Sequence, residues 1–178
     1  WKKDEKFGYK SPWGVGRPGW HIECSAMSKR HLADEIDIHA GGADLIFPHH
    51  ENEIAQSECA NGCRFVKYWL HNGFVTINKE KMSKSLGNFI TIEGLLDKYD
   101  ANTIRFFILT NNYRMPVEFN DEALEAAQAG AKRLKNAANN VLAWVGKDAL
   151  IDVAESDEIE EFKAAMNDDF NTSKALAV

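Results

Sequence analysis

Three side chains in the first third of the chain could share a metal ion. His49 and Glu53 are four residues apart, so on a helix they lie on one face and can bind the same ion. Cys24, on a separate predicted helix, could supply a thiolate, and Cys, His and Glu together suit zinc. The spacing alone leaves a surface pair at His49 and Glu53, and a packing role for Cys24, as alternatives. His50, three residues before Glu53, is a rival ligand.

A second group of residues could act on phosphates. Lys81 and Lys84 are three residues apart in a polar segment that also holds Ser83 and Ser85 and is followed by Gly87. Such a loop suits mobile neutralisation of phosphate charge in a transition state. The alternative for an arbitrary lysine pair is a solvated basic loop.

Two other patterns do not predict a binding site. Residues 14–19 spell G-x-G-x-x-G, but residues 9–13 before them are predicted to be a loop rather than the strand that a dinucleotide-binding turn requires. Pro18 also removes a backbone amide from the turn. Cys59 and Cys63 lack the two-residue gap of a zinc knuckle, so we expect them to be structural.

The elements that must position these groups form an α/β pattern in the first part of the chain. Residues 1–19 are punctuated by proline and glycine and are predicted to be loop. After them we expect helices over residues 20–32 and from Pro48 to Asn61. We expect a strand over residues 35–40 and one or two strands over residues 64–77. Gly41 and Gly42 are expected to end the first strand. A polar loop over residues 78–88 and short helices near residues 92–98 and 101–110 follow.

From about residue 120 the pattern becomes helical. Small and apolar residues recur at spacings of three and four, which predicts one long helix with a buried seam; they are Leu124, Ala127, Ala131, Leu134, Ala138, Val141 and Val145. Ser156 is a good N-cap for a second helix, and a third helix is expected after Asn171. The predicted organisation is therefore an α/β portion (residues 1–75), a connector (76–119) and a helical bundle (120–178).

Composition restricts the classes of protein to consider. The chain has 178 residues, 44% of them hydrophobic and 27% charged, which excludes a disordered or collagen-like protein. No apolar run is long enough for a membrane span, and no signal peptide is visible, so we expect no membrane partner. Three cysteines, an odd number, favour a reducing compartment, and we expect the cytoplasm. The net charge of −6 is concentrated in residues 152–169, which hold eight acids and one lysine, so it does not exclude a polyanionic ligand.

An ordered set of motifs resembles one family. Residues 81–85 match the KMSKS signature of class I aminoacyl-tRNA synthetases, and they follow GWHIECSAM at 19–27, HAGGADL at 39–45 and FPHHENE at 47–53. Together with DDFNT at 168–172, this set resembles the cysteinyl-tRNA synthetases over nearly the whole chain. The resemblance implies the second half of a Rossmann-like catalytic domain, a stem-contact connector that carries the KMSKS loop, and a helical bundle.

The resemblance also implies an activity and a site. Cysteine and ATP, with Mg2+, form cysteinyl-adenylate, and the cysteinyl group then moves to tRNA(Cys). A zinc ion binds the substrate thiolate with ligands that match Cys24, His49 and Glu53. The other implied site residues are Lys84 and Lys81 on the departing pyrophosphate, Ser83 in the ATP site, Gly42 and Asp44 beside the substrate amino group and ribose, and Trp20 as a wall of the amino-acid pocket.

The family's remaining parts have no match here. These are a fourth zinc ligand, a cysteine, together with the HIGH signature of the first catalytic half and the anticodon-binding region. The sequence is therefore expected to be a middle portion, inactive by itself. Two alternatives stay open: the related ligase that joins cysteine to an amino-sugar in mycothiol synthesis, and a non-catalytic binding module.

Overall fold

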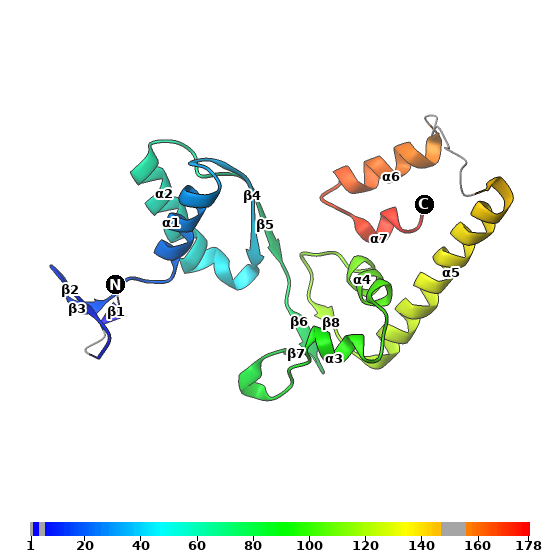
Figure 1. Ribbon diagram of the computed structural model, residues 1–178, viewed down its shortest axis with the longest axis horizontal. Coiled ribbons are helices and arrows are strands. Elements are labelled where there is room, and N and C mark those ends of the chain that lie inside the picture. Colours follow the sequence, from blue (N-terminus) through cyan, green and yellow to red (C-terminus); the bar gives the residue numbers. More distant parts are fainter. Residues whose placement is uncertain (1, 4–5, 147–155) are drawn as a thin grey trace. The chain divides into compact units, whose positions relative to one another are not determined.

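The computed structural model describes residues 2–3, 6–146 and 156–178. They divide into two compact units, Trp1–Asn72 and Gly73–Val178, which are described separately below (Figure 1). The fold is mixed α/β, with helices toward the C-terminus, as the sequence predicts. No helix among these residues is long and apolar enough to cross a membrane.

The first unit begins with a small antiparallel sheet, where the sequence predicted a loop. The strands are β1 (Lys2–Lys3), β2 (Tyr9–Ser11) and β3 (Gly14–Arg17), with β3 in the middle. The pairing of Lys2 with Arg17 joins residues far apart in sequence, so no local periodicity reveals it. Gly14 and Gly16 belong to a hairpin strand, so the G-x-G-x-x-G pattern is not a strand-to-helix turn.

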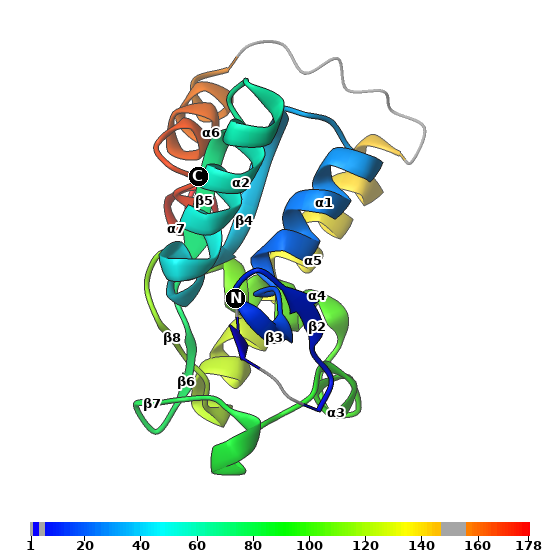
Figure 2. The ribbon, with the colours of Figure 1, turned by 90° about the vertical axis from the view of Figure 1, so that its left-hand side faces the viewer.

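The rest of the first unit is one strand–helix–strand unit with a helix packed beside it. α1 (His21–His31) precedes β4 (Ile36–Gly42); the short turns η1 (Ala43–Leu45) and η2 (Ile46–His50) then lead into α2 (Glu51–Asn61), which is followed by β5 (Val66–Asn72). β4 and β5 are parallel, and the chain path between them through α2 can be followed in Figure 2. α1 and α2 lie side by side, joined by a hydrogen bond from Ser25 Oγ to Gln56 Oε1.

Local sequence explains the ends of α2 but not the end of β4. The backbone of Phe47 is extended, so the helical course begins at Pro48, and Gly62 in the left-handed conformation ends α2, both as predicted. Gly41 and Gly42, however, continue β4 and pair with His71 and Asn72. The expected break is wrong because sheet pairing overrides the weak strand propensity of glycine.

The second unit is built around a three-stranded sheet, β6 (Val75–Ile77), β7 (Glu80–Lys81) and β8 (Val117–Glu118), with β6 in the middle. β7 and the turn η3 (Lys84–Leu86) lie within the segment predicted to be loop. α3 (Ile92–Leu96), α4 (Ala101–Leu109) and the long α5 (Asp121–Val145) follow the predicted positions. Their apolar side chains form one core with the sheet, made of Phe107, Val117, Phe119, Leu124 and Ala127.

α5 buries its apolar seam only near its N-terminal end. Leu124 and Ala127 are buried, but Leu134, Val141 and Val145 are about half exposed, at 50%, 52% and 47%. The expectation of a seam buried along its whole length is therefore wrong for the described residues. The 9 residues of α4 span about 14 Å and the 25 residues of α5 about 38 Å, so α4 covers only part of α5.

Two short helices complete the second unit: α6 (Asp157–Asn167), capped by Ser156, and α7 (Thr172–Ala175), capped by Asn171, both as predicted. The corner between them contacts the loop before β8. Arg114 makes a two-pronged ion pair with Asp169, and the Tyr113 hydroxyl donates to the same carboxylate at 2.8 Å. The sequence also predicts a loop near residues 146–155, of which 147–155 lie outside the described residues.

Candidate metal and phosphate sites

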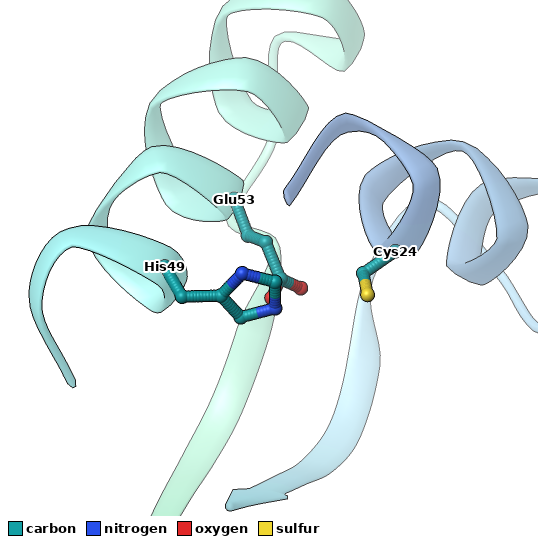
Figure 3. Close-up of side chains that lie close together, drawn as sticks. All are labelled: Cys24, His49 and Glu53. Carbon is teal, nitrogen blue, oxygen red and sulfur yellow. The ribbon is translucent and has the colours of Figure 1, made fainter. Parts of the chain in front are cut away.

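The three predicted metal ligands meet in the first unit. The Sγ of Cys24, a ring nitrogen of His49 and a carboxylate oxygen of Glu53 all lie within 4.8 Å of one another. Figure 3 shows Cys24 extending from one helix toward His49 and Glu53, which come from the other. The i, i+4 spacing predicted this face, and the packing of α1 against α2 brings the thiol to it.

Glu53 is the buried centre of this group. Its side chain is 0% exposed, and its Oε1 lies 2.8 Å from Nε2 of His49, yet Oε1 has no hydrogen-bond partner. The two atoms are thus close without the alignment of a hydrogen bond, an arrangement that suits two ligands of one ion better than a donor and an acceptor. Oε2 accepts a hydrogen bond from Nε2 of His39 at 3.0 Å. Burial raises the pKa of Glu53, and His49 opposes that shift.

The electrostatics of the Cys24 thiol also fit a cation. Burial raises its pKa, the negative charge of Glu53 raises it further, and a hydrogen bond with the Trp20 side chain acts in the opposite direction. A thiol beside a buried carboxylate resists ionisation, and a bound cation reverses this because it stabilises the thiolate directly. The residues present therefore fit a zinc ion, with Cys24, His49 and Glu53 as three ligands.

A second set of histidines lies behind the first and includes the rival ligand His50. His39, His50 and Glu53 also bring their ligand atoms within 4.8 Å of one another. His50 Nδ1 and His71 Nε2 share a hydrogen bond at 2.8 Å. Burial and three neighbouring histidines lower the pKa of His50 to about 4, so this ring is neutral near pH 7. Its hydrogen bond to His71 links His50 to strand β5. Because it also lies in the second cluster, His50 stays an alternative metal ligand.

His39 and His71 were not identified from the sequence. They lie toward the carboxyl ends of the parallel strands β4 and β5, where Gly41 pairs with His71. Ligands commonly bind at this edge of a parallel sheet. A sequence signal was therefore available: two histidines near the ends of neighbouring predicted strands.

The other predicted residues of the first unit occupy neighbouring positions. The Trp20 ring packs on His49 with centroids 3.8 Å apart, and the Trp20 side chain is 55% exposed, so it forms one wall beside the metal ligands. Asp44 lies against Gly42, where an added Cβ would be only 2.5 Å from Asp44 Oδ1. The Asp44 carboxylate thus occupies the space beside Gly42, and a side chain at position 42 would displace it.

The lysine segment belongs to the second unit. Lys81 ends β7, and its Nζ lies 3.9 Å from the centre of the Phe74 ring. The Ser83 amide donates to Asn88 Oδ1 at 2.8 Å, and Gly87 takes a left-handed φ of 68° that closes the segment. Lys84 begins η3, and its side chain lies outside what the structure describes.

The three cysteines, Cys24, Cys59 and Cys63, differ in their exposure to solvent. All three are free, in agreement with the absence of a disulfide framework. Cys59 and Cys63 are exposed, and neither joins a metal cluster among the residues that the structure describes.

Curated relatives match all or nearly all of the chain. It is 54% identical over 180 residues to a cysteine–tRNA ligase from Hahella chejuensis and 55% identical over 180 residues to one from Laribacter hongkongensis, each alignment covering 100% of the chain. A third such ligase, from Trichlorobacter lovleyi, is 57% identical over 94% of the chain. The chain spans 38%, 39% and 37% of the lengths of these three relatives.

Solved structures agree on the fold. A LeuRS–tRNA–LeuAMS ternary complex from Agrobacterium radiobacter matches 96% of the chain and 27% of that protein with a TM-score of 0.67 and 16% identity. A Mycobacterium tuberculosis methionyl-tRNA synthetase with methionyl-adenylate matches 83% of the chain and 31% of that protein, with a TM-score of 0.55 and 22% identity.

Two family models divide the chain between them. Residues 161–178 match the model described as the DALR domain. Residues 1–129, more than half of the chain, match the model described as the tRNA synthetases class I (C) catalytic domain. The chain therefore belongs to the family of class I tRNA synthetase (C) catalytic domains.

Proposed function

We propose that the protein containing this chain is a cysteine–tRNA ligase. It activates cysteine with ATP, as the Mg2+ complex, to cysteinyl-adenylate and transfers the cysteinyl group to tRNA(Cys) in the cytoplasm. The convergence of Cys24, His49 and Glu53 carries the proposal. These three donors suit a zinc ion, and a zinc ion binds a substrate that is itself a thiol. The relatives named above, at 54–57% identity, support the same activity.

The metal ligands explain the choice of cysteine. Zinc held by Cys24, His49 and Glu53 would bind the substrate sulfur as a thiolate. A hydroxyl is a much poorer partner for a soft-metal site, so selection against serine depends on a ligand bond. Packing against one methylene would discriminate only about 10–200-fold. Trp20, whose half-exposed ring packs on His49, would contact the substrate and limit its size.

Groups of the two units contribute separately to activation. Asp44, set against Gly42, accepts from the substrate amino group or the ATP ribose. Lys84 stabilises the departing pyrophosphate, Lys81 assists, and Ser83 helps shape their segment through its bond to Asn88. Each lysine stabilises negative charge that grows as the bond to pyrophosphate breaks. It therefore lowers the barrier to adenylate formation and leaves the affinity for cysteine unchanged.

The chain by itself is proposed to lack this activity. It spans about 38% of the ligases that it matches, and the family's HIGH signature and fourth ligand have no match in it. With phosphate-binding groups on one side only, the in-line geometry of attack on the α-phosphate is not enforced.

Cysteine-dependent exchange of pyrophosphate with ATP tests the proposal in the parent ligase. Cys24→Ser should abolish zinc binding and nearly all exchange, whereas Cys59→Ser, which changes an exposed cysteine, should leave both intact. Charging of tRNA(Cys), compared with ligation to an amino-sugar, separates this activity from that of the mycothiol enzyme. Unchanged zinc affinity in Cys24→Ser would remove Cys24 from the site, and exchange by the 178-residue chain alone would refute its inactivity.

A further inference from the structure

A strained turn lies directly before the lysine segment. Ile77 pairs with Glu80, so β6 and β7 are joined by a two-residue loop, Asn78–Lys79. Both loop residues have positive φ, 53° and 64°, as a type I′ turn requires. Glycine is preferred in such turns because a side chain is unfavourable in the left-handed conformation. Lys79 therefore occupies a position that other contacts must stabilise.

The stabilising contacts come from Glu118 on β8. The Lys79 amide donates to both carboxylate oxygens of Glu118, at 3.1 and 3.2 Å, and the Thr76 hydroxyl donates to Oε2. The hydrogen bonds from Thr76 and Lys79 lower the pKa of Glu118. Hydrogen bonds from amides to an ionised acceptor are among the stronger ones in proteins. One carboxylate thus holds the Lys79 amide of the turn and the strand that leads into it.

The turn sets the register of everything that follows it. Thr76 pairs with Lys81, and the Met82 amide donates to the Val75 carbonyl at 2.9 Å, so the lysine segment starts from a fixed point on β6. In a two-residue hairpin the turn type determines this register. β8, which carries Glu118, is itself fixed, because Val117 donates to the carbonyl of Phe74 and packs in the core.

We propose that Glu118 is a positioning residue for the lysine segment: by holding the Asn78–Lys79 turn, it sets where Lys81 and the residues after it begin. The role rests on the proposed function, since the lysines act on pyrophosphate. Glu118 itself contacts neither ATP nor cysteine in this proposal. Its loss displaces the lysines and leaves the amino-acid site of the first unit unchanged.

The test changes Glu118 in the parent ligase, once in the wild-type sequence and once together with Lys79→Gly. Glu118→Ala should lower kcat for pyrophosphate exchange about tenfold, below the 10²-fold that a 1 Å misplacement can produce, with KM for cysteine unchanged. Lys79→Gly removes the strain that makes the carboxylate necessary. In the Lys79→Gly background, the further change Glu118→Ala should therefore lower kcat by less than about twofold. Glu118→Gln, which keeps one acceptor oxygen, should fall between wild type and Glu118→Ala.

Amide hydrogen exchange gives a second readout that does not depend on activity. Glu118→Ala should speed exchange at the Lys79 and Met82 amides about tenfold. Glu80→Ala, the control, removes an exposed charge next to the same turn and should change neither exchange nor kcat. An equal loss of kcat in both backgrounds, or unchanged exchange at Lys79, would overturn the role of Glu118. If the wild-type ligase shows no cysteine-dependent activity, the proposed function fails, and amide exchange still decides whether Glu118 holds the turn.

Discussion

Replacing Glu53 by glutamine should separate metal binding from folding. The side chain is fully buried, with Oε1 close to His49 but unpartnered and Oε2 bonded to His39. Glutamine has nearly the same shape without the charge, and a neutral amide costs less to bury than a carboxylate. We therefore expect the zinc-free Glu53→Gln chain to be at least as stable as the zinc-free wild type.

With zinc present, the wild type should be more stable than Glu53→Gln. Changes in groups that merely support metal ligands weaken metal binding by about 10–100-fold, so loss of a charged ligand should weaken it at least about 100-fold. At a zinc concentration of about 100 times the wild-type Kd, bound metal stabilises the wild type by about 2.7 kcal/mol. A variant with 100-fold weaker binding gains only about 0.4 kcal/mol at the same concentration. The difference of about 2.3 kcal/mol corresponds to roughly 5–9 °C in Tm for a chain of this length.

Thermal unfolding in a chelator and in buffered zinc measures the stability difference between wild type and Glu53→Gln under each condition. Glu51→Gln, an exposed change two residues away on the same helix, is the matched control and should follow the wild type under both conditions. An equal zinc-induced rise in Tm for Glu53→Gln would show that Glu53 is not a ligand. A large loss of stability in the chelator would show instead that its role is structural.

The remaining predictions concern the second unit. In the parent ligase Lys84→Ala should slow adenylate formation by about 10²–10³-fold with little change in cysteine affinity, measured by pyrophosphate exchange; a near wild-type rate would contradict its role. Leu124→Ala should lower the free energy of unfolding by about 3–5 kcal/mol, and Leu134→Ala by less than about 0.5 kcal/mol, in denaturant titrations, because only the first is buried. Hydrogen bonds from Thr103 lower the pKa of Asp100 below 3.8, so the folded state binds this proton less readily than the unfolded state. Its contribution is present above pH 3.8 and lost as the pH falls through the lowered value, so the Tm gap between wild type and Asp100→Ala should narrow there; a constant gap would contradict the assignment.

The sequence allowed prediction of those features that depend on neighbours in the chain. The i, i+4 spacing of His49 and Glu53 fixes their common face once the helix forms, and Gly62 and Ser156 act on the helix ends beside them. Residue chemistry made Cys24 a candidate and the motif resemblance supported it, but its approach to the other two depends on how α1 packs on α2. Local pattern alone left that approach open.

What could not be predicted depends on contacts between distant segments. β4 continues through its glycines because β5 pairs with them, and Gly41 leaves room for His50, whose Cε1 would lie 2.8 Å from an added Cβ. The short strands of residues 2–17 exist only as a set, and β1 has too few residues to show a period. Glu118 has an unremarkable sequence position, and only the fold places its carboxylate under the turn of a hairpin about 40 residues away.

The single glycine of α5 has a consequence for the uniqueness of the native packing. An added Cβ on Gly130 would lie 2.5 Å from Cε1 of Phe106 on α4, so the ring occupies the space that a side chain would fill. Around it α5 carries alanines at positions 123, 126, 127, 129 and 131, which offer almost equivalent surfaces to a partner helix. If α5 moved by one residue along its own helical screw, Ala129 or Ala131 would take the place of Gly130 against the Phe106 ring. One missing methyl group therefore distinguishes the native register of α5 from its near-equivalents, because only glycine leaves room for the Phe106 ring.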